Sequence, residues 1–170
     1  MAGAVVAFPT FGEADRRLVE EIRREHDPNA ARIAAHFTLV FPDSKTKAGD
    51  LLGPAAAVAR ETSPLAFVLR RVIVHHRAPD TYVFLVPDEG HESLVRLHDR
   101  LKAHSPLSAG EAFLPHITVA RLSSRDAAKT LATRLAGRRL AVPGTVGALS
   151  VVEVEAAGPV RTVDSFPLRA

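Results

Sequence analysis

The sequence predicts an α+β domain built as two pseudo-symmetric lobes, with two mainly antiparallel sheets lining a central cleft and helices on the outside. The length of 170 residues suits a single domain spanning 1–170. An order of strands and helices repeats once along the chain, and a His-x-Thr triplet stands at the same place in each copy. A helix that covers one face of a sheet leaves the other face free to line a cleft.

The first half of the chain reads as strand, helix, strand, helix, strand. Short apolar runs and strict alternation of apolar and polar residues mark the strands, and apolar residues at intervals of three and four mark the helices. The expected elements are a strand over 4–8, a helix over 13–25, a strand over 36–41, a helix over 50–61 and a strand over 65–76.

The same order begins again after the turn at Ala78-Pro79-Asp80, and further strands then complete the chain. The expected elements are a strand over 81–86, a helix over 91–104, a strand over 115–121, a helix over 123–137 and strands over 147–155 and 160–168. With only two copies and a long period, the repeat indicates paired lobes rather than a solenoid.

The two triplets belong to the motifs 36–39 (His-Phe-Thr-Leu) and 116–119 (His-Ile-Thr-Val), 80 residues apart. Chance would give roughly 0.5 His-x-Thr triplets in a chain of this composition. A lone histidine on a strand is typically a surface or core residue. The duplication at matching places in a repeated element order favours a function for both copies.

Strand geometry gives the duplicated motif a chemical meaning. Residues i and i+2 of a strand point to the same side, so His36 with Thr38, and His116 with Thr118, each present an imidazole and a hydroxyl together. One neutral imidazole can take a proton from water while a protonated one donates to a leaving oxygen. The hydroxyls can donate to non-bridging oxygens of a phosphoryl group. The pattern predicts metal-free phosphodiester chemistry with no cofactor.

Composition excludes several other classes. The chain has no cysteine, which excludes disulfides, thiolate metal sites and a cysteine nucleophile. No apolar stretch approaches the roughly 20 residues of a membrane helix, and no signal peptide is recognised. The formal net charge of +3 is spread along the chain. A cytoplasmic monomer that does not bind a membrane is expected.

Several weaker candidate residues also have ordinary structural roles. Arg121 could neutralise a phosphate, but a regular strand would point it away from the motif residues, so it is a site residue only if a bulge intervenes. Phe8, Phe41 and Phe113 could stack a nucleobase, and core packing is the expectation for each. The adjacent pair at 75–76 (His-His) faces opposite ways on a strand, so no metal site is expected there.

The chain resembles the two-histidine (2H) phosphoesterase superfamily, in particular its 2′-5′ RNA ligase-like members. The segment from His26-Asp-Pro to His36-Phe-Thr-Leu-Val-Phe-Pro42 is similar to the first motif region of bacterial members, and Phe113-Leu-Pro-His-Ile-Thr-Val-Ala-Arg121 to the second. The resemblance implies the bilobal fold of that family. One departure is Ala35, where many relatives have proline before the first histidine.

The resemblance also implies an activity. Family members open 2′,3′-cyclic phosphates of RNA ends or nucleotides to 2′-phosphates, and some join 2′,5′-linked RNA by the reverse chemistry. By analogy His36 is the proton donor and His116 the acceptor, with Thr38 and Thr118 binding the phosphate. Two alternatives stay open: a non-catalytic module that binds RNA ends, and a phosphoesterase for a non-RNA cyclic phosphate such as an ADP-ribose derivative.

Overall fold

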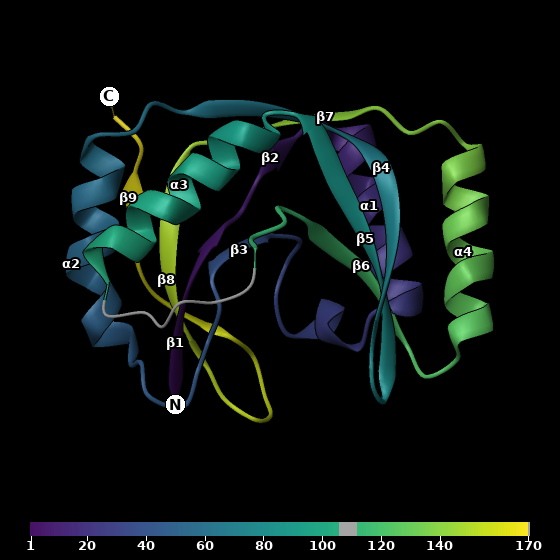
Figure 1. Cartoon of the computed structure of the whole chain (residues 1–170), viewed down its shortest axis with the longest axis horizontal. Helices are drawn as coiled ribbons and strands as arrows, with labels where there is room; N and C mark the ends of the chain where they lie inside the picture. Colours follow the sequence, from purple (N-terminus) through teal and green to yellow (C-terminus); the bar gives the residue numbers. More distant parts are fainter. Residues whose placement is uncertain (106–111, 170) are drawn as a thin grey trace.

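The computed structural model describes residues 1–105 and 112–169, and in these ranges strands and helices follow the expected order (Figure 1). The strands are β1 (Ala2–Ala7), β2 (Thr10–Phe11), β3 (Phe37–Val40), β4 (Leu65–Arg77), β5 (Asp80–Glu89), β6 (Ile117–Leu122), β7 (Val142–Val146), β8 (Ala148–Val154) and β9 (Arg161–Pro167). The helices are α1 (Glu13–His26), the short 3₁₀ helix η1 (Pro28–Ala31), α2 (Ala48–Arg60), α3 (His91–His104) and α4 (Arg125–Gly137). The predicted α+β class is confirmed.

The strands form one curled antiparallel sheet in the order β2-β7-β4-β5-β6-β3-β1-β8-β9. The two expected sheets are therefore joined into one, at the pair β3–β6. These two strands pair through Phe37 and Ile117. Both side chains are fully buried, so the two halves of the sheet meet within the core and share it.

The two halves of the sequence are interleaved in space. Helices α2 and α3 cover the part of the sheet formed by β1, β3, β8 and β9, whereas α1 and α4 lie on the part formed by β4, β5 and β6. Figure 1 shows α2 and α4 at opposite ends of the molecule. Helix α1 comes from the first half of the chain but packs on β6, and α3 comes from the second half but packs on β3. Each half thus supplies a helix that covers the other half's histidine strand.

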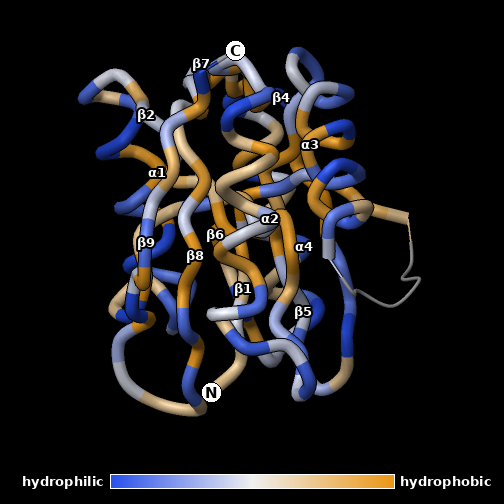
Figure 2. Tube along the Cα trace, turned by 90° about the vertical axis from the view of Figure 1, so that its left-hand side faces the viewer, coloured by the Kyte–Doolittle hydropathy of each residue, from blue (hydrophilic) through white to orange (hydrophobic). Residues whose placement is uncertain are grey.

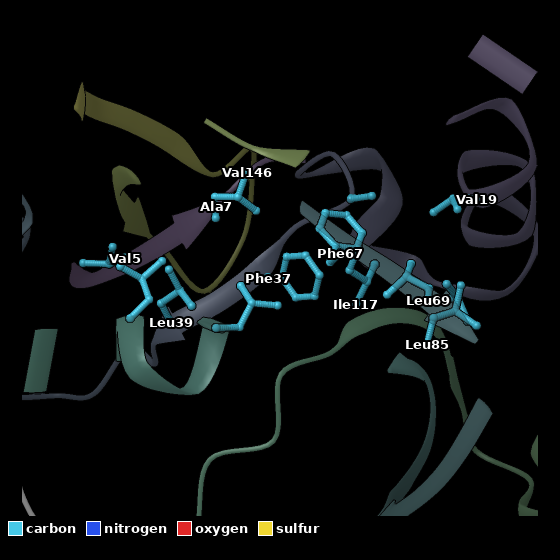
Figure 3. Close-up of a cluster of buried hydrophobic side chains, with 14 of the residues drawn as sticks. Val5, Ala7, Val19, Phe37, Leu39, Phe67, Leu69, Leu85, Ile117 and Val146 are labelled. Atoms are coloured by element: carbon cyan, nitrogen blue, oxygen red, sulfur yellow. The ribbon is translucent and has the colours of Figure 1, made fainter. Parts of the chain in front are cut away.

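The main core lies between the helices and the sheet. Figure 2 shows the apolar segments of β1, β6 and β8 running through the middle of the molecule. The close-up in Figure 3 shows side chains from both halves of the sheet meeting there. Phe37 and Phe67 pack edge to face, with ring centroids 5.0 Å apart at 87°, a favourable geometry for aromatic pairs.

Strands β2 and β7 were not predicted. Strand β7 contains Pro143 and Gly144, residue types that usually mark turns. The glycine has a packing reason: a Cβ built at Gly144 would lie 2.5 Å from Cζ of Phe67. The close approach of β7 to this ring, rather than a turn, explains the glycine, and no local sequence pattern reveals it.

Candidate active site

The two motifs lie side by side on β3 and β6 and face the same way. Extending the antiparallel pair Phe37–Ile117 by one residue on each side sets His36 opposite Thr118 and Thr38 opposite His116. Directly opposed residues have Cβ atoms about 5 Å apart. The structure therefore brings together the four residues that the sequence singled out.

Burial alternates identically in the two motifs. The histidines and threonines are half-buried, while the residues between them are buried. The buried residues are Ala35, Phe37, Leu39 and Val40 in the first motif, and Pro115, Ile117, Val119 and Ala120 in the second. Each strand is thus anchored by its core face while its polar side chains reach solvent.

Each imidazole is held by a backbone carbonyl two residues earlier. Nδ1 of His36 lies 2.8 Å from the oxygen of Ala34, and Nδ1 of His116 lies 2.7 Å from the oxygen of Leu114. A carbonyl only accepts hydrogen bonds, so Nδ1 carries the hydrogen in both rings. Nε2 of each ring is then the atom left to take or give a proton in a reaction.

Both imidazoles lose their proton more readily in the folded protein than a free imidazole does in water. Burial lowers the pKa of His36 and of His116 below the ordinary 6.5, and the hydrogen bond to the backbone carbonyl partly raises each pKa again. The charge of Arg23 also lowers the pKa of His36, whereas Asp27 and Glu20 raise it.

The two imidazoles also influence one another electrostatically. The positive charge of His36 lowers the pKa of His116, and that of His75 does so too. Protonating one ring of the pair therefore disfavours protonating the other. Such pairs titrate together, and singly protonated states are favoured between the two steps. An acid and a base can thus coexist at one site.

Aromatic rings surround the second imidazole. Phe84 of β5 stacks on His116 with centroids 3.8 Å apart at 22°, and Phe41 is stacked beside it at 6.4 Å and 26°. His75 stacks on the other side of Phe84 at 5.5 Å and 19°. The role of Phe84 was missed in the sequence, because a phenylalanine in a strand reads as core and nothing local identifies its partner.

A β-bulge follows the His-x-Thr triplet in each strand. Against β1, Val5 pairs with Val40 and Val6 with Thr38, which leaves an extra residue in β3 at position 39. Against β5, Val83 pairs with Ala120 and Phe84 with Thr118, which leaves an extra residue in β6 at position 119. A bulge shifts the alternation by one residue. The residues after the bulges, 41 and 121, therefore return to the side of the motif residues.

These bulges overturn the expectation for Phe41, whose side chain is 51% exposed rather than part of the core. They also place Arg121 on the same face as His116 and Thr118. The condition for Arg121 to be a candidate site residue, an intervening bulge, is therefore met. Nε of Arg121 donates to Asp80 Oδ2 at 2.8 Å.

The other two phenylalanines have packing roles. Phe8 packs on a small apolar cluster of β1 and β8, and its ring also meets His36 edge-on at 6.2 Å. Phe113 packs against the main core and stacks on His98 at 4.1 Å.

Cavity volume does not identify the site. One hollow of about 280 Å³ is lined by residues 61–65 and α3, and another of about 430 Å³ by β2, β4 and β7. Within the described ranges, no group of three or more His, Cys, Asp or Glu side chains could hold a metal ion. In those ranges, no helix has the length and apolarity that crossing a bilayer requires.

Comparison with known proteins agrees with the geometry. A family model described as the 2′-5′ RNA ligase superfamily matches residues 11–158. A protein of Bacillus pumilus (strain SAFR-032) that is named as a phosphoesterase is 31% identical over 129 residues, covering 74% of this chain and 73% of that protein.

Solved structures share the fold. E. coli LigT complexed with 3′-AMP is similar with a TM-score of 0.62 at 18% identity, over 99% of each chain. Kluyveromyces marxianus Usb1 is similar with a TM-score of 0.61 at 9% identity, over 98% of each chain. The family match and the shared fold together give the assignment: the chain belongs to the 2′-5′ RNA ligase superfamily and is an enzyme of the two-histidine phosphoesterase class.

Proposed function

We propose that the chain is a metal-independent phosphodiesterase that opens 2′,3′-cyclic phosphates of RNA ends or nucleotides to 2′-phosphates. The observation that carries the proposal is the symmetric pair of imidazoles, each with Nδ1 bound to a carbonyl and Nε2 left for proton transfer. The threonine hydroxyls across the β3–β6 pair supply neutral donors beside them. Solved relatives of the same fold carry bound 3′-AMP and uridine monophosphate.

In the proposed reaction, water attacks the cyclic phosphorus and gives its proton to Nε2 of His116. The P–O3′ bond breaks, and Nε2 of the protonated His36 donates to the departing O3′. The products are a 2′-phosphate and a free 3′-hydroxyl. Burial lowers the pKa of both imidazoles. Among the charged groups near His36, Arg23 lowers its pKa and Asp27 and Glu20 raise it, whereas the charged groups that act on His116 are His36 and His75, which lower its pKa. The resemblance to the family assigns His36 as the donor and His116 as the acceptor.

The negative charge that develops on the non-bridging oxygens needs donors. Thr38 and Thr118 would supply hydroxyl donors there, and Arg121, on the same face, would supply a positive charge. A 5′-hydroxyl of RNA in place of the attacking water would give a 2′-5′ linkage through the same proton transfers. Hydrolysis and ligation are thus one mechanism with two nucleophiles.

The test is turnover of a 2′,3′-cyclic nucleotide by variants at the two histidines. His36→Ala and His116→Ala should each lower kcat by roughly 10²- to 10⁴-fold, the usual contribution of a general acid or base. Chromatography separates the 2′- from the 3′-phosphate product, and circular dichroism checks the fold. Undiminished turnover in either variant removes that histidine from the mechanism.

Threonine variants test the hydroxyl donors in the same assay, and Thr38→Ser is the matched control. Thr38→Ala and Thr118→Ala should cost roughly 10²-fold, the loss of one oxyanion donor, while Thr38→Ser keeps the hydroxyl and should retain most activity. A cyclic oligonucleotide that binds without being hydrolysed would instead indicate an RNA-end-binding module. Turnover of an ADP-ribose cyclic phosphate in preference to RNA ends would keep the mechanism and change the substrate.

A further inference from the structure

Helix α1 and the residue that caps its end carry a charged cluster of Glu20, Arg23 and Asp27 next to the first motif. The three residues follow the helical spacing i, i+3 and i+7, so they lie along one side of the helix end. The side chain of Arg23 is 1% exposed, that of Asp27 3% and that of Glu20 27%. Nη1 of Arg23 lies 3.1 Å from Oε2 of Glu20, and its Nη2 lies 3.4 Å from Oδ2 of Asp27.

A buried guanidinium is costly to keep. Its Nε has no hydrogen-bond partner among the described residues, and neither ion pair is short. Well-packed apolar residues often replace buried ion pairs without loss of stability. The contacts that Arg23 and Glu20 make with the backbone of the first motif give the cluster a purpose beyond stability.

Two of these contacts fix the backbone on either side of Ala34. Nη2 of Arg23 donates to the oxygen of Ile33 at 2.8 Å. The amide of Ala35 donates to Oε1 of Glu20 at 2.8 Å. Between these two points stands the oxygen of Ala34, which receives Nδ1 of His36 at 2.8 Å. Glu20 therefore binds the N–H of the same peptide group whose carbonyl accepts from the His36 ring, and Arg23 binds the carbonyl of the preceding peptide group.

The second motif reaches the same arrangement by other means. Its acceptor is the oxygen of Leu114, and the next residue is Pro115, which is buried. Proline fixes its own φ and has no amide hydrogen to satisfy. At the matching place the first motif has Ala35, whose freer backbone and amide hydrogen both need a partner. Glu20 supplies it, and the alanine is thereby explained as one half of an alanine–glutamate pair.

We propose that Glu20 and Arg23 are positioning residues that hold the Ala34 carbonyl and so fix the tautomer and orientation of His36. The inference rests on the proposed function for its catalytic consequence and on geometry alone for its structural one. Groups that orient a metal-ligating histidine through its second ring nitrogen typically contribute 10- to 100-fold to metal affinity or activity. An effect of that size is expected here.

The same cluster sets the charge around His36. Arg23 lowers the pKa of His36, and Asp27 and Glu20 raise it. From the other motif, His116 shares an electrostatic interaction with His36. Neutralising Glu20 leaves Arg23 less compensated, so the pKa of His36 should fall. The pH profile then separates this role from simple loss of stability, which would not move it.

The experiment compares Glu20→Gln and Glu20→Ala with Glu13→Gln, a matched control. Glu13 lies on the same helix in an exposed ion pair with Arg17. Two readouts are used: the ¹⁵N shifts of the His36 ring against pH, which report tautomer and pKa, and turnover of a 2′,3′-cyclic nucleotide. The control should match the wild type in both.

Glu20→Gln keeps an acceptor for the Ala35 amide, so the tautomer should persist while the His36 titration moves to lower pH. Glu20→Ala should mix the two tautomers and lower kcat by roughly tenfold. Adding Ala35→Pro to Glu20→Ala copies the Leu114-Pro115-His116 arrangement and should restore most of the lost activity.

An unchanged His36 tautomer in folded Glu20→Ala overturns the inference. The inference also fails if Ala35→Pro, added to Glu20→Ala, does not restore the wild-type tautomer of His36. The ring shifts decide the positioning role whether or not cyclic nucleotides are turned over. Absence of turnover in the wild type would count against the proposed function alone.

Discussion

His116 is enclosed by side chains that its own sequence neighbourhood does not indicate. Phe84 comes from a strand 32 residues earlier, and its ring lies 3.8 Å from the imidazole, centroid to centroid. Such stacking excludes water from one face of the ring and fixes its plane. It also contributes to the burial that lowers the pKa of His116.

Removing the Phe84 ring tests this arrangement. Phe84→Leu should lower kcat by roughly 10- to 100-fold, because a displaced base loses its alignment with the substrate. Water that reaches the imidazole should raise the pKa of His116 toward its ordinary value, so the limb of the pH profile that requires a neutral base moves to higher pH.

Phe113→Leu is the matched control for this change. Phe113 stacks on His98 with centroids 4.1 Å apart at 9°, outside the site. The variant Phe113→Leu should leave kcat and the pH profile unchanged. Equal effects of the two substitutions would show that general destabilisation, and not the contact with His116, causes the loss.

At the scale of elements, the bulges of β3 and β6 decide which side chains join the site. Arg121 lies on the face of His116 because the extra residue at position 119 shifts the alternation. Arg121→Ala should therefore raise KM for a cyclic nucleotide by roughly tenfold, the loss of a charge-assisted contact of about 1.5 kcal/mol. The control is Arg17→Ala, which removes another exposed, ion-paired arginine and should leave KM unchanged. An unaltered KM in Arg121→Ala would exclude the arginine from substrate binding.

The order of most elements and the meeting of the two motifs at one site could be predicted, because the element order repeats along the sequence with one motif in each copy. The common orientation of the histidine and the threonine in each motif follows from the rule that residues i and i+2 share a side of a strand. That same rule failed at Phe41, since a bulge is defined by the register with another strand and has no local mark. Likewise the partner of Ala35 is a glutamate 15 residues earlier, which only the packing of α1 reveals.

At the scale of the whole molecule, the histidines link stability to pH. Their pKa values are lower in the folded state than the ordinary 6.5, so below about pH 6.5 the unfolded chain binds more protons. The contribution of the neutral rings to stability is present above that pH and is lost as the pH falls. The low pKa values of Asp43 and Asp88 act in a separate window, below their ordinary 3.8.

Urea unfolding between pH 7.5 and 5.5 measures this effect. The wild type should lose stability over that interval, and the double variant His36→Gln, His116→Gln should lose less, since two of the groups that bind protons on unfolding are gone. Both proteins should keep the same dependence on urea concentration. Parallel loss of stability in the two proteins would contradict the lowered pKa values.

One residue pair, Phe37 with Ile117, joins the two parts of the sheet, and each member stands directly between the histidine and the threonine of its motif. This pair therefore joins the sheet and also spaces the polar residues of the two motifs. A smaller side chain at either position, as in Phe37→Leu or Ile117→Val, would loosen the fold and change the spacing of the rings together. Substitutions at these two positions should therefore change stability and turnover together.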